Sequence, residues 1–306
     1  IEPSVSYPLG EAHLTIDESG GEIKNLAFEM SQEQAGIAAV MADGRTVFMA
    51  LTAEENMMTG DISWTQTSTV LPDAPAKVDQ ILLLPNLRNL YLRSGNRLAI
   101  YDISNVDDVH LTSMIDINAP EANVTKVRLL TGASSLIVGN DNGAVSQWFE
   151  VTKDGSRKLT LIREFKAQAG VVDIAPEFFR KGFLTLDKEG YLGIFHTTGN
   201  TRLLSEKLSD KPLQALAISP RANAILVEEP NLLTLYHLTN EHPEVTWSAL
   251  WQEVWYEGYP EPDYIWQSTS ASDEFEPKLS LVPISFGTIK AAFYAMLFAV
   301  PIALAG

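Results

Sequence analysis

The chain contains no cysteine among its 306 residues, and positive charge is scarce, with 22 Lys and Arg against 39 Asp and Glu. The absence of cysteine excludes disulfides, thiolate catalysis, and zinc or iron–sulfur sites that use cysteine. A net charge of −17 argues against nucleic acid, because nucleic-acid binding depends on Lys and Arg that neutralise phosphates. It also argues against an anionic membrane surface, which attracts basic segments. We therefore expect no nucleic-acid partner.

Motifs for catalysis and cofactor binding are also missing. The sequence has no G-x-S-x-G, H-E-x-x-H, G-x-x-x-x-G-K-[ST] or G-x-G-x-x-G pattern, and its five histidines are scattered. His196 and His237 each follow a large aromatic residue at equivalent places, but loop or strand-exterior positions explain them more simply than a metal site. Glu228 and Glu229 are neighbours, and adjacent strand residues point to opposite faces. We predict no catalytic, cofactor-binding or metal-binding residues, no cofactor, and no enzyme activity.

The excess of acidic over basic residues is concentrated in the two flanks of the chain. Residues 1–75 hold 12 acids and two bases, residues 76–251 hold 20 and 18, and residues 252–278 hold seven and one. The last 28 residues carry one charge, Lys290. This distribution predicts a nearly neutral folded body between two acidic segments.

The two ends of the sequence suggest a segment of a longer protein. The chain opens at Ile1 rather than Met and has no basic and apolar regions of a signal peptide. Residues 291–306 carry no charge and would make about 24 Å of helix, short of the roughly 30 Å hydrocarbon core. Adding residues 281–288, with Lys290 reaching for the interface, brings the run close to spanning length. We expect the start of a transmembrane helix; the alternative is a buried core helix.

Five segments of the chain repeat one pattern, an alternating β run, a turn with Gly or Asn, and a second run that ends in a large residue. The closing residues are separated by 52, 47, 47 and 41 positions, which matches the roughly 40–50 residues of a β-propeller blade. The five segments are Gly36–Met49, Asn89–Tyr101, Ser135–Trp148, Gly182–Phe195 and Asn223–Tyr236.

Further alternating runs flank these segments, so each unit has up to four short strands, the number in a propeller blade. Runs begin upstream at Val78, Val124, Val171 and Leu213 and downstream at His110, Leu159 and Arg202. Residues 14–28 could complete a first or a closing blade. We predict an all-β fold, a WD40-like β-propeller of five to seven blades without clear Trp-Asp and Gly-His signatures. A β-sandwich is the alternative, since it also has short strands with frequent turns.

The pattern changes after Thr246, where four of the six tryptophans gather with tyrosines and prolines. Their spacing predicts a short amphipathic helix over residues 248–255. The aromatics would suit the interfacial belt of a membrane, or they would pack on the last blade; the sequence leaves both open. The expected organisation is a periplasmic propeller over 1–251, an acidic aromatic linker over 252–278 and the truncated start of a transmembrane domain over 279–306.

The C-terminal stretch resembles a known family. Residues 250–306, and above all PKLSLVPISFGTIKAAFYAMLFAVPIALAG from Pro277 to Gly306, are similar to the start of the transmembrane domain in permease subunits of bacterial phosphate ABC importers of the Pst type. The preceding residues resemble the family only through an enlarged external domain that some members carry. The resemblance implies an inner-membrane protein with a first helix upstream of Ile1 and a periplasmic propeller.

The same resemblance implies phosphate as cargo. The implied partners are a second permease subunit, a periplasmic phosphate-binding protein and a cytoplasmic ATPase. The loop that couples permease to ATPase would lie beyond Gly306, so no functional residue of the family is placed on this chain. Because the body is nearly neutral, we expect the propeller to act as an interaction or regulatory module. The alternatives are a membrane-anchored periplasmic propeller enzyme, such as a hydrolase or a lactonase-like protein, and an envelope assembly scaffold.

Overall fold

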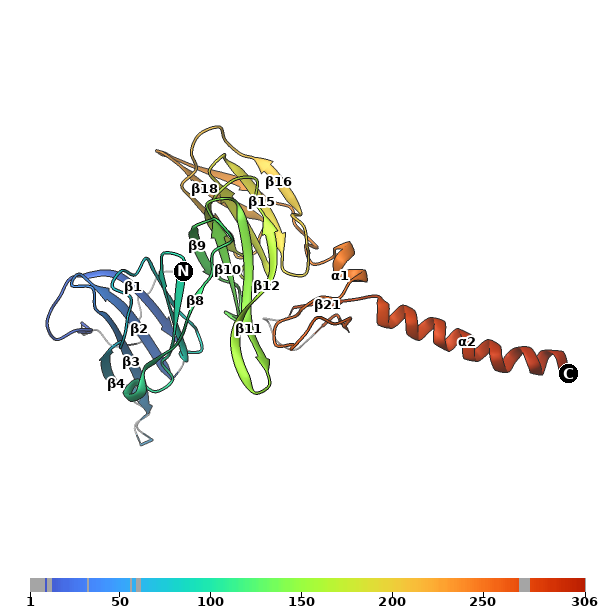
Figure 1. Ribbon diagram of the computed structural model, residues 1–306, viewed down its shortest axis with the longest axis horizontal. Helices are drawn as coiled ribbons and strands as arrows, with labels where there is room; N and C mark the ends of the chain where they lie inside the picture. The colour runs from blue at the N-terminus through green and yellow to red at the C-terminus, as the bar shows by residue number, and fades with distance from the viewer. Residues whose placement is uncertain are drawn as a thin grey trace. The chain divides into compact units, whose positions relative to one another are not determined.

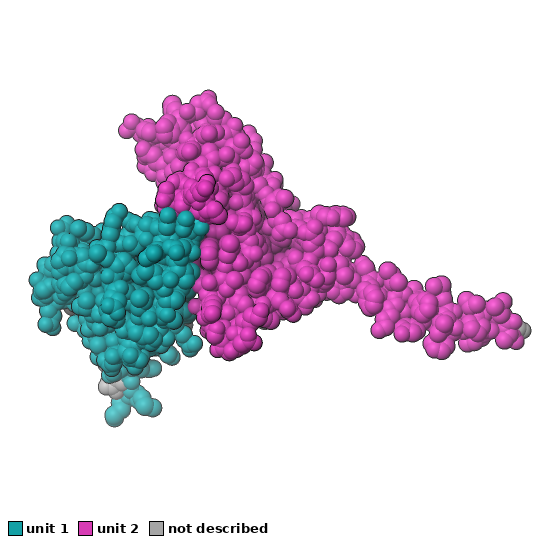
Figure 2. Space-filling model, viewed as in Figure 1, with its two compact units in different colours: residues 1–118 teal, residues 119–306 magenta. Residues whose placement is uncertain are grey.

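A computed structural model describes residues 9, 13–31, 33–55, 57–58, 62–269 and 276–305. The chain forms two compact units, residues 1–118 (unit 1) and residues 119–306 (unit 2), coloured separately in Figure 2. Each unit is described by itself below. The predicted boundaries at 251 and 278 stay a prediction.

Unit 1 consists of two antiparallel sheets in which the strands follow one another in chain order (Figure 1). Neighbouring sheets meet at their first strands, since β5 lies against β1 and β2. A single 3₁₀ turn, η1 (Val106–Asp108), interrupts the second sheet before its last strand. The strands are β1 (Ile23–Met30), β2 (Gln34–Met41), β3 (Thr46–Glu55) and β4 (Ile62–Val70), then β5 (Gln80–Leu83), β6 (Asn89–Ser94), β7 (Arg97–Asp102) and β8 (His110–Asp116).

Unit 2 continues the same arrangement with two four-stranded sheets and one three-stranded sheet. Here too the first strands of neighbouring sheets lie together, because β13 contacts both β9 and β17. The strands are β9 (Val124–Leu129), β10 (Ser135–Asn140), β11 (Ala144–Lys153), β12 (Ser156–Lys166), β13 (Val171–Pro176), β14 (Gly182–Asp187), β15 (Tyr191–His196), β16 (Leu204–Lys207), β17 (Ala215–Ile218), β18 (Ala224–Glu229) and β19 (Leu232–His237).

The five sheets confirm the repeat and the all-β fold. Each predicted closing residue sits on the third strand of its sheet and faces a large apolar residue of the second strand. The pairs are Ile37 with Met49, Leu90 with Tyr101, Leu136 with Trp148, Phe183 with Phe195 and Ile225 with Tyr236. Residues 14–28 contribute β1, which completes the first sheet. We call the sheets blades 1 to 5 in chain order.

The turns between the second and third strands have the backbone that their sequences predict. Gly143 and Gly190 both have φ of +84°, in the left-handed region that only glycine enters freely. Blade 5 has Asn231 in place of glycine, at φ +68°. Asparagine is one of the few other residues that tolerate this conformation.

Apolar side chains between neighbouring blades form the core. In unit 2 three rings lie between blades 3 and 4: Phe183 stacks on Phe195 at 5.1 Å, and Phe165 meets both edge-on. A second cluster joins blades 4 and 5, and Tyr101 and Phe48 belong to a cluster between blades 1 and 2 in unit 1. Successive side chains of a strand point to opposite faces of its sheet, so the apolar ones on one face pack against the neighbouring sheet.

One carboxylate connects three blades of unit 2. Asp173 lies on β13, and its side chain is 6% exposed. It accepts the backbone N–H of Leu216 on β17 at 3.1 Å. From β9 it is approached by Lys126 Nζ at 3.0 Å and Arg128 Nη2 at 3.3 Å. The buried charge is therefore paired, as burial requires.

The chain ends in α2 (Val282–Ala305), the red helix of Figure 1. Its 24 residues give about 36 Å of helix, more than the roughly 30 Å of a bilayer core. No residue of α2 is buried, so the alternative of a core helix is wrong for the described chain. Within that part of the chain α2 is the helix long and apolar enough to cross a membrane.

Replacing Gly190 with alanine tests the turn geometry. A Cβ at this position would lie 2.1 Å from the carbonyl oxygen of Ser209, whereas a Cβ at Gly155 would meet open space. Both glycines have positive φ, so both substitutions cost about 1–2 kcal/mol of backbone strain. We expect Gly190→Ala to lose a further 1–3 kcal/mol or so through overpacking. Equal losses for Gly190→Ala and Gly155→Ala in urea unfolding would contradict the turn as described.

Candidate functional site

The segment after blade 5 forms a junction between the blades of unit 2 and α2. It contains the helix α1 (Trp247–Trp251) and a two-stranded sheet of β20 (Trp266–Gln267) and β21 (Lys278–Leu279), drawn in orange in Figure 1. Thr246 caps α1, because its Oγ1 accepts the N–H of Ala249 at 3.1 Å. We call residues 246–281, in their described part, the junction segment.

The predicted helix over residues 248–255 is wrong in length. α1 ends at Trp251, because Gln252 already has extended backbone, with φ −113° and ψ 163°. Val254 then pairs with Asp263 in an isolated β bridge. The aromatic spacing suggests a longer helix, but the chain changes from helical to extended between Trp251 and Trp255. The spacing therefore continues past the end of the helix.

A buried ion pair fixes the junction segment to blades 3 and 4. Lys181 Nζ lies 2.7 Å from Glu257 Oε2, and the two side chains are 4% and 14% exposed. Lys181 precedes β14 and also donates to the carbonyl of Thr131 at 2.6 Å. Ser134 and Ser135, at the start of β10, donate to the two oxygens of the same carboxylate. The Glu257 carboxylate therefore pairs with a cation from blade 4 and accepts hydrogen bonds from two hydroxyls of blade 3.

A second buried carboxylate lies in the last part of the junction segment. Thr197 Oγ1, next to β15, donates to Glu276 Oε1 at 2.7 Å. Burial raises the pKa of Glu276, and the nearby Glu257 carboxylate adds to the rise, while Thr197 and Arg163 oppose it. Arg163 on β12 donates from Nη2 to the carbonyl of Trp255 at 2.6 Å. The junction segment is thus bonded to β12 and to the residue after β15, as well as to the loops.

Aromatic side chains complete the contact with the blades. Trp255 meets Phe149 of β11 edge-on, with ring centroids 6.2 Å apart. Tyr256 is 1% exposed, and burial raises its pKa to about 12. Lys278 Nζ lies 5.5 Å from the ring centroid of Tyr256 and 5.7 Å from that of Tyr259, within cation–π range. A charged residue of β21 is therefore held against two rings instead of facing solvent.

Two backbone hydrogen bonds hold the last residues of the junction segment, just before α2 begins. The N–H of Leu281 donates to the carbonyl of Leu250 in α1 at 2.8 Å. The N–H of Ser280 donates to the carbonyl of Ile265, next to β20, at 3.0 Å. Within the range 252–278, predicted to be a linker, Val254, Tyr256, Glu276 and Lys278 are buried, whereas residues 260–264 and 266–269 are exposed.

The two histidines singled out in the sequence occupy different environments. His196 is buried at the end of β15, and Thr198 donates its backbone N–H to Nδ1 at 3.3 Å. Burial lowers the pKa of His196 to about 3, so the ring is neutral at pH 7. His237 is exposed at the end of β19. The described residues contain no group of three or more His, Asp or Glu that could hold a metal ion. Glu229 is buried and Glu228 exposed, on opposite faces of β18 as predicted.

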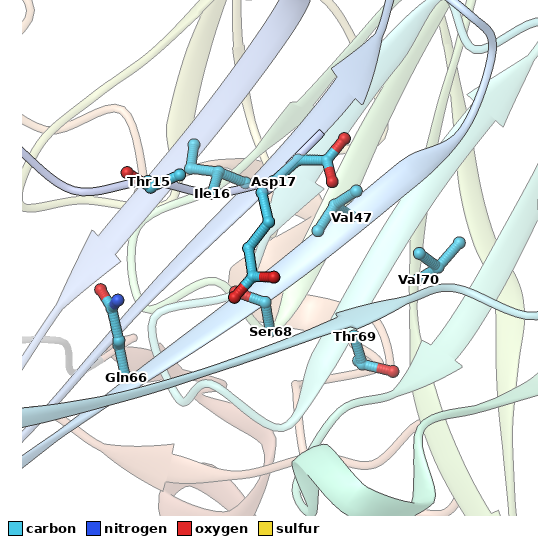
Figure 3. A pocket seen from close by; sticks show the side chains of 9 residues that line it. Thr15, Ile16, Asp17, Val47, Gln66, Ser68, Thr69 and Val70 are labelled. Carbon is cyan, nitrogen blue, oxygen red and sulfur yellow. The ribbon is translucent and has the colours of Figure 1, made fainter. Parts of the chain in front are cut away.

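A cavity of about 380 Å³ lies in unit 1, between the chain before β1 and strand β4. Figure 3 shows Asp17 beside Val47, with Gln66, Ser68 and Thr69 along the facing strand. Hydrogen bonds from Ser19 and Arg45 lower the pKa of Asp17 to about 2. Arg45 also pairs with Asp43 at 2.7 Å. An anion such as phosphate would meet carboxylates here, and the nearest cation is already shared by two of them.

Comparison with known proteins supports the fold and goes no further. No protein-family model matches the chain, and no curated protein matches it. Among solved structures, the β-propeller domain of Cps50 (Swd1) from Myceliophteria thermophila is similar, with 14% identity and a TM-score of 0.50. The match covers 68% of this chain and 68% of that domain. The chain therefore has a β-propeller fold followed by an apolar C-terminal helix, and the β-sandwich alternative is wrong.

Replacing Lys181 with methionine tests the ion pair. The substitution leaves the Glu257 carboxylate buried without its cation, and losing one partner of a buried pair typically costs about 3–5 kcal/mol. We expect a loss of about 3 kcal/mol in the free energy of unfolding of unit 2, measured by urea titration. Lys188→Met changes an exposed lysine in the next turn and serves as the control. The ion pair contributes little if both variants unfold at the same urea concentration.

The buried His196 predicts a pH dependence. Its pKa is about 3 in the folded chain and 6.5 ordinarily, so below pH 6.5 the unfolded chain binds a proton that the folded chain does not. The associated stability is fully present above pH 6.5 and falls by up to about 1.4 kcal/mol per pH unit as the pH drops toward 3. We expect His196→Gln to lack this dependence and His237→Gln to keep it. Parallel stability profiles for the wild type and His196→Gln would refute the assignment.

Proposed function

We propose that the chain is the periplasmic propeller domain, with the first part of the membrane domain, of a permease subunit in a bacterial phosphate ABC importer. In this proposal the propeller is an interaction module on the outer face of the inner membrane. The observation that carries the proposal is that α2 begins directly after the hydrogen-bonded junction segment. It lies within the stretch Pro277–Gly306, whose sequence resembles these permeases. Phosphate as cargo rests on the resemblance.

The composition of α2 supports a helix that packs among other membrane helices. Lys290 lies nine residues into the helix, and ionisable residues at such depth usually face other helices or a water-filled cavity. Small residues recur at every fourth position, and in membranes such rows allow two helices to approach closely. They are Gly287, Ala291, Ala295, Ala299 and Ala303. The remaining membrane domain and the second permease subunit would provide the neighbours.

Three cations of unit 2 that are shielded from solvent are already engaged and offer no phosphate site. Phosphate sites use free Arg or Lys side chains or helix N-termini. The buried Lys181 is paired with Glu257, and Arg163 donates to the carbonyl of Trp255. Arg180 is paired with Glu177. A propeller instead presents rigid loops, which proteins commonly use to bind partners. The partner in this proposal is the periplasmic phosphate-binding protein, with the ATPase on the cytoplasmic side.

Removing the blades from the complete transporter tests this function. Residues 23–245 would be replaced by a short Gly-Ser linker in the permease, and phosphate uptake into proteoliposomes measured against the concentration of binding protein. We expect the concentration needed for half-maximal uptake to rise at least about tenfold, equivalent to about 1.4 kcal/mol of lost docking energy. ATP hydrolysis without binding protein should not change, which controls for assembly of the membrane subunits.

Unchanged uptake and unchanged affinity for the binding protein would reject the docking role. That result would favour one of the two alternatives, a propeller enzyme anchored by α2 or an envelope assembly scaffold. An enzyme would be expected to turn over small esters or lactones in the absence of the ATPase. A scaffold would be expected to copurify with envelope proteins unrelated to transport. These readouts separate the three classes.

A further inference from the structure

Three tryptophans of the junction segment have exposed rings. Trp247 is 75% exposed, Trp266 is 44% exposed and Trp251 is 38% exposed. The rings of Trp247 and Trp251 lie 6.0 Å apart on α1. Large exposed aromatic side chains are uncommon on a water-facing surface unless they contact something else. We call these three residues the tryptophan cluster.

Neighbouring aromatic residues of the same segment are packed inside the protein and not exposed. Trp255 packs on Phe149 of β11 and donates its Nε1–H to the carbonyl of Tyr259 at 2.9 Å, and Tyr256 is buried. Packing on the blades, one of the two explanations that the sequence left open, therefore holds for Trp255. Tyr256 is buried beside Tyr259 and Lys278 of the same segment, while the tryptophan cluster remains uncovered.

The position of the tryptophan cluster relative to α2 is fixed by hydrogen bonds. Trp251 follows Leu250, whose carbonyl accepts the N–H of Leu281. Trp266 pairs with Leu279 across β20 and β21. Both attachments lie within three residues of Val282, where α2 begins. The cluster is thus held at the level at which the chain would enter a bilayer.

The length of α2 places this level at the membrane interface. A helix of about 36 Å exceeds the roughly 30 Å hydrocarbon core by about 6 Å, so its ends lie among the lipid headgroups. Tryptophan prefers this region, because its ring is apolar and its N–H still finds a polar partner. Residues 252–278 carry seven acids and one base, so attraction to anionic lipids cannot hold the segment there.

We propose that the tryptophan cluster inserts into the interfacial region of the same bilayer that α2 crosses, and that it does so through its aromatic rings, independently of lipid charge. The inference rests on the membrane-spanning role of α2 in the proposed function. It adds an orientation of the blades to that function. The junction segment is bonded to the β9–β10 and β13–β14 loops through Ser134 and Lys181. That end of blades 3 and 4 then faces the membrane. The opposite loops face away, where a soluble partner can reach them.

Tryptophan fluorescence can test this in the whole chain, because α2 contains no tryptophan. The 306-residue chain would be reconstituted in phosphatidylcholine vesicles with and without brominated acyl chains, which quench only tryptophans at the membrane. We expect quenching of the wild type and its loss in the triple variant Trp247→Phe, Trp251→Phe, Trp266→Phe. The control, Trp64→Phe with Trp148→Phe, removes tryptophans of blades 1 and 3 and should retain the quenching. Vesicles with anionic lipid or high salt should give the same result.

Flotation of the vesicles separates failure of this inference from failure of the proposed function. A chain that floats with the vesicles but shows no quenching overturns the inference and leaves the membrane helix intact; it would indicate that another protein covers the tryptophan cluster. Equal quenching of the triple variant and the wild type also overturns it. A chain that does not float overturns both. Circular dichroism of each variant, compared with the wild type, shows that the blades are still folded.

Discussion

The connection between the propeller and the apolar C-terminal helix α2 depends on the buried ion pair of Lys181 and Glu257. Two charges that are 4% and 14% exposed cost free energy to desolvate, and only close pairing with further hydrogen bonds compensates that cost. The chain meets this requirement with donors from two blades, Ser134 and Ser135 on one and Lys181 on the other. Glu257 can be accommodated only where both blades are already folded. The ion pair therefore makes the position of the junction segment conditional on the propeller.

The repeat could be predicted from the sequence because its signals are local. Alternation of apolar residues defines each strand, and a residue that tolerates positive φ defines each tight turn. The replacement of glycine by Asn231 in blade 5 follows from the same rule. The closing residues also indicate the strand register, since Met49, Tyr101 and Phe195 each face a large apolar residue of the preceding strand. None of these features requires knowledge of distant contacts.

The junction could not be predicted in this way, because its partners are far apart in the chain. Lys181 and Glu257 are separated by 76 residues, and Thr197 and Glu276 by 79. Both acids belong to the range 252–278, which the sequence predicts to be an acidic aromatic linker. Burial of His196 is equally invisible, since it depends on how the chain after β15 folds over the ring. A weak signal did exist: Trp255 and Tyr256 are unusually apolar for a linker, and both pack on the blades or between junction residues.

The hydrogen bonds of the junction segment determine how the propeller is connected to α2. A flexible linker would let a domain sample many orientations and would transmit no torque. Here the residues just before α2 are bonded to α1 and to the chain beside β20, and the same segment is bonded to β12, β15 and the loops of blades 3 and 4. Unless those buried bonds break, the residues just before α2 must move together with these blades. A partner that binds the blades would thereby be connected to the residues that lead into α2, which is what the proposed docking role requires.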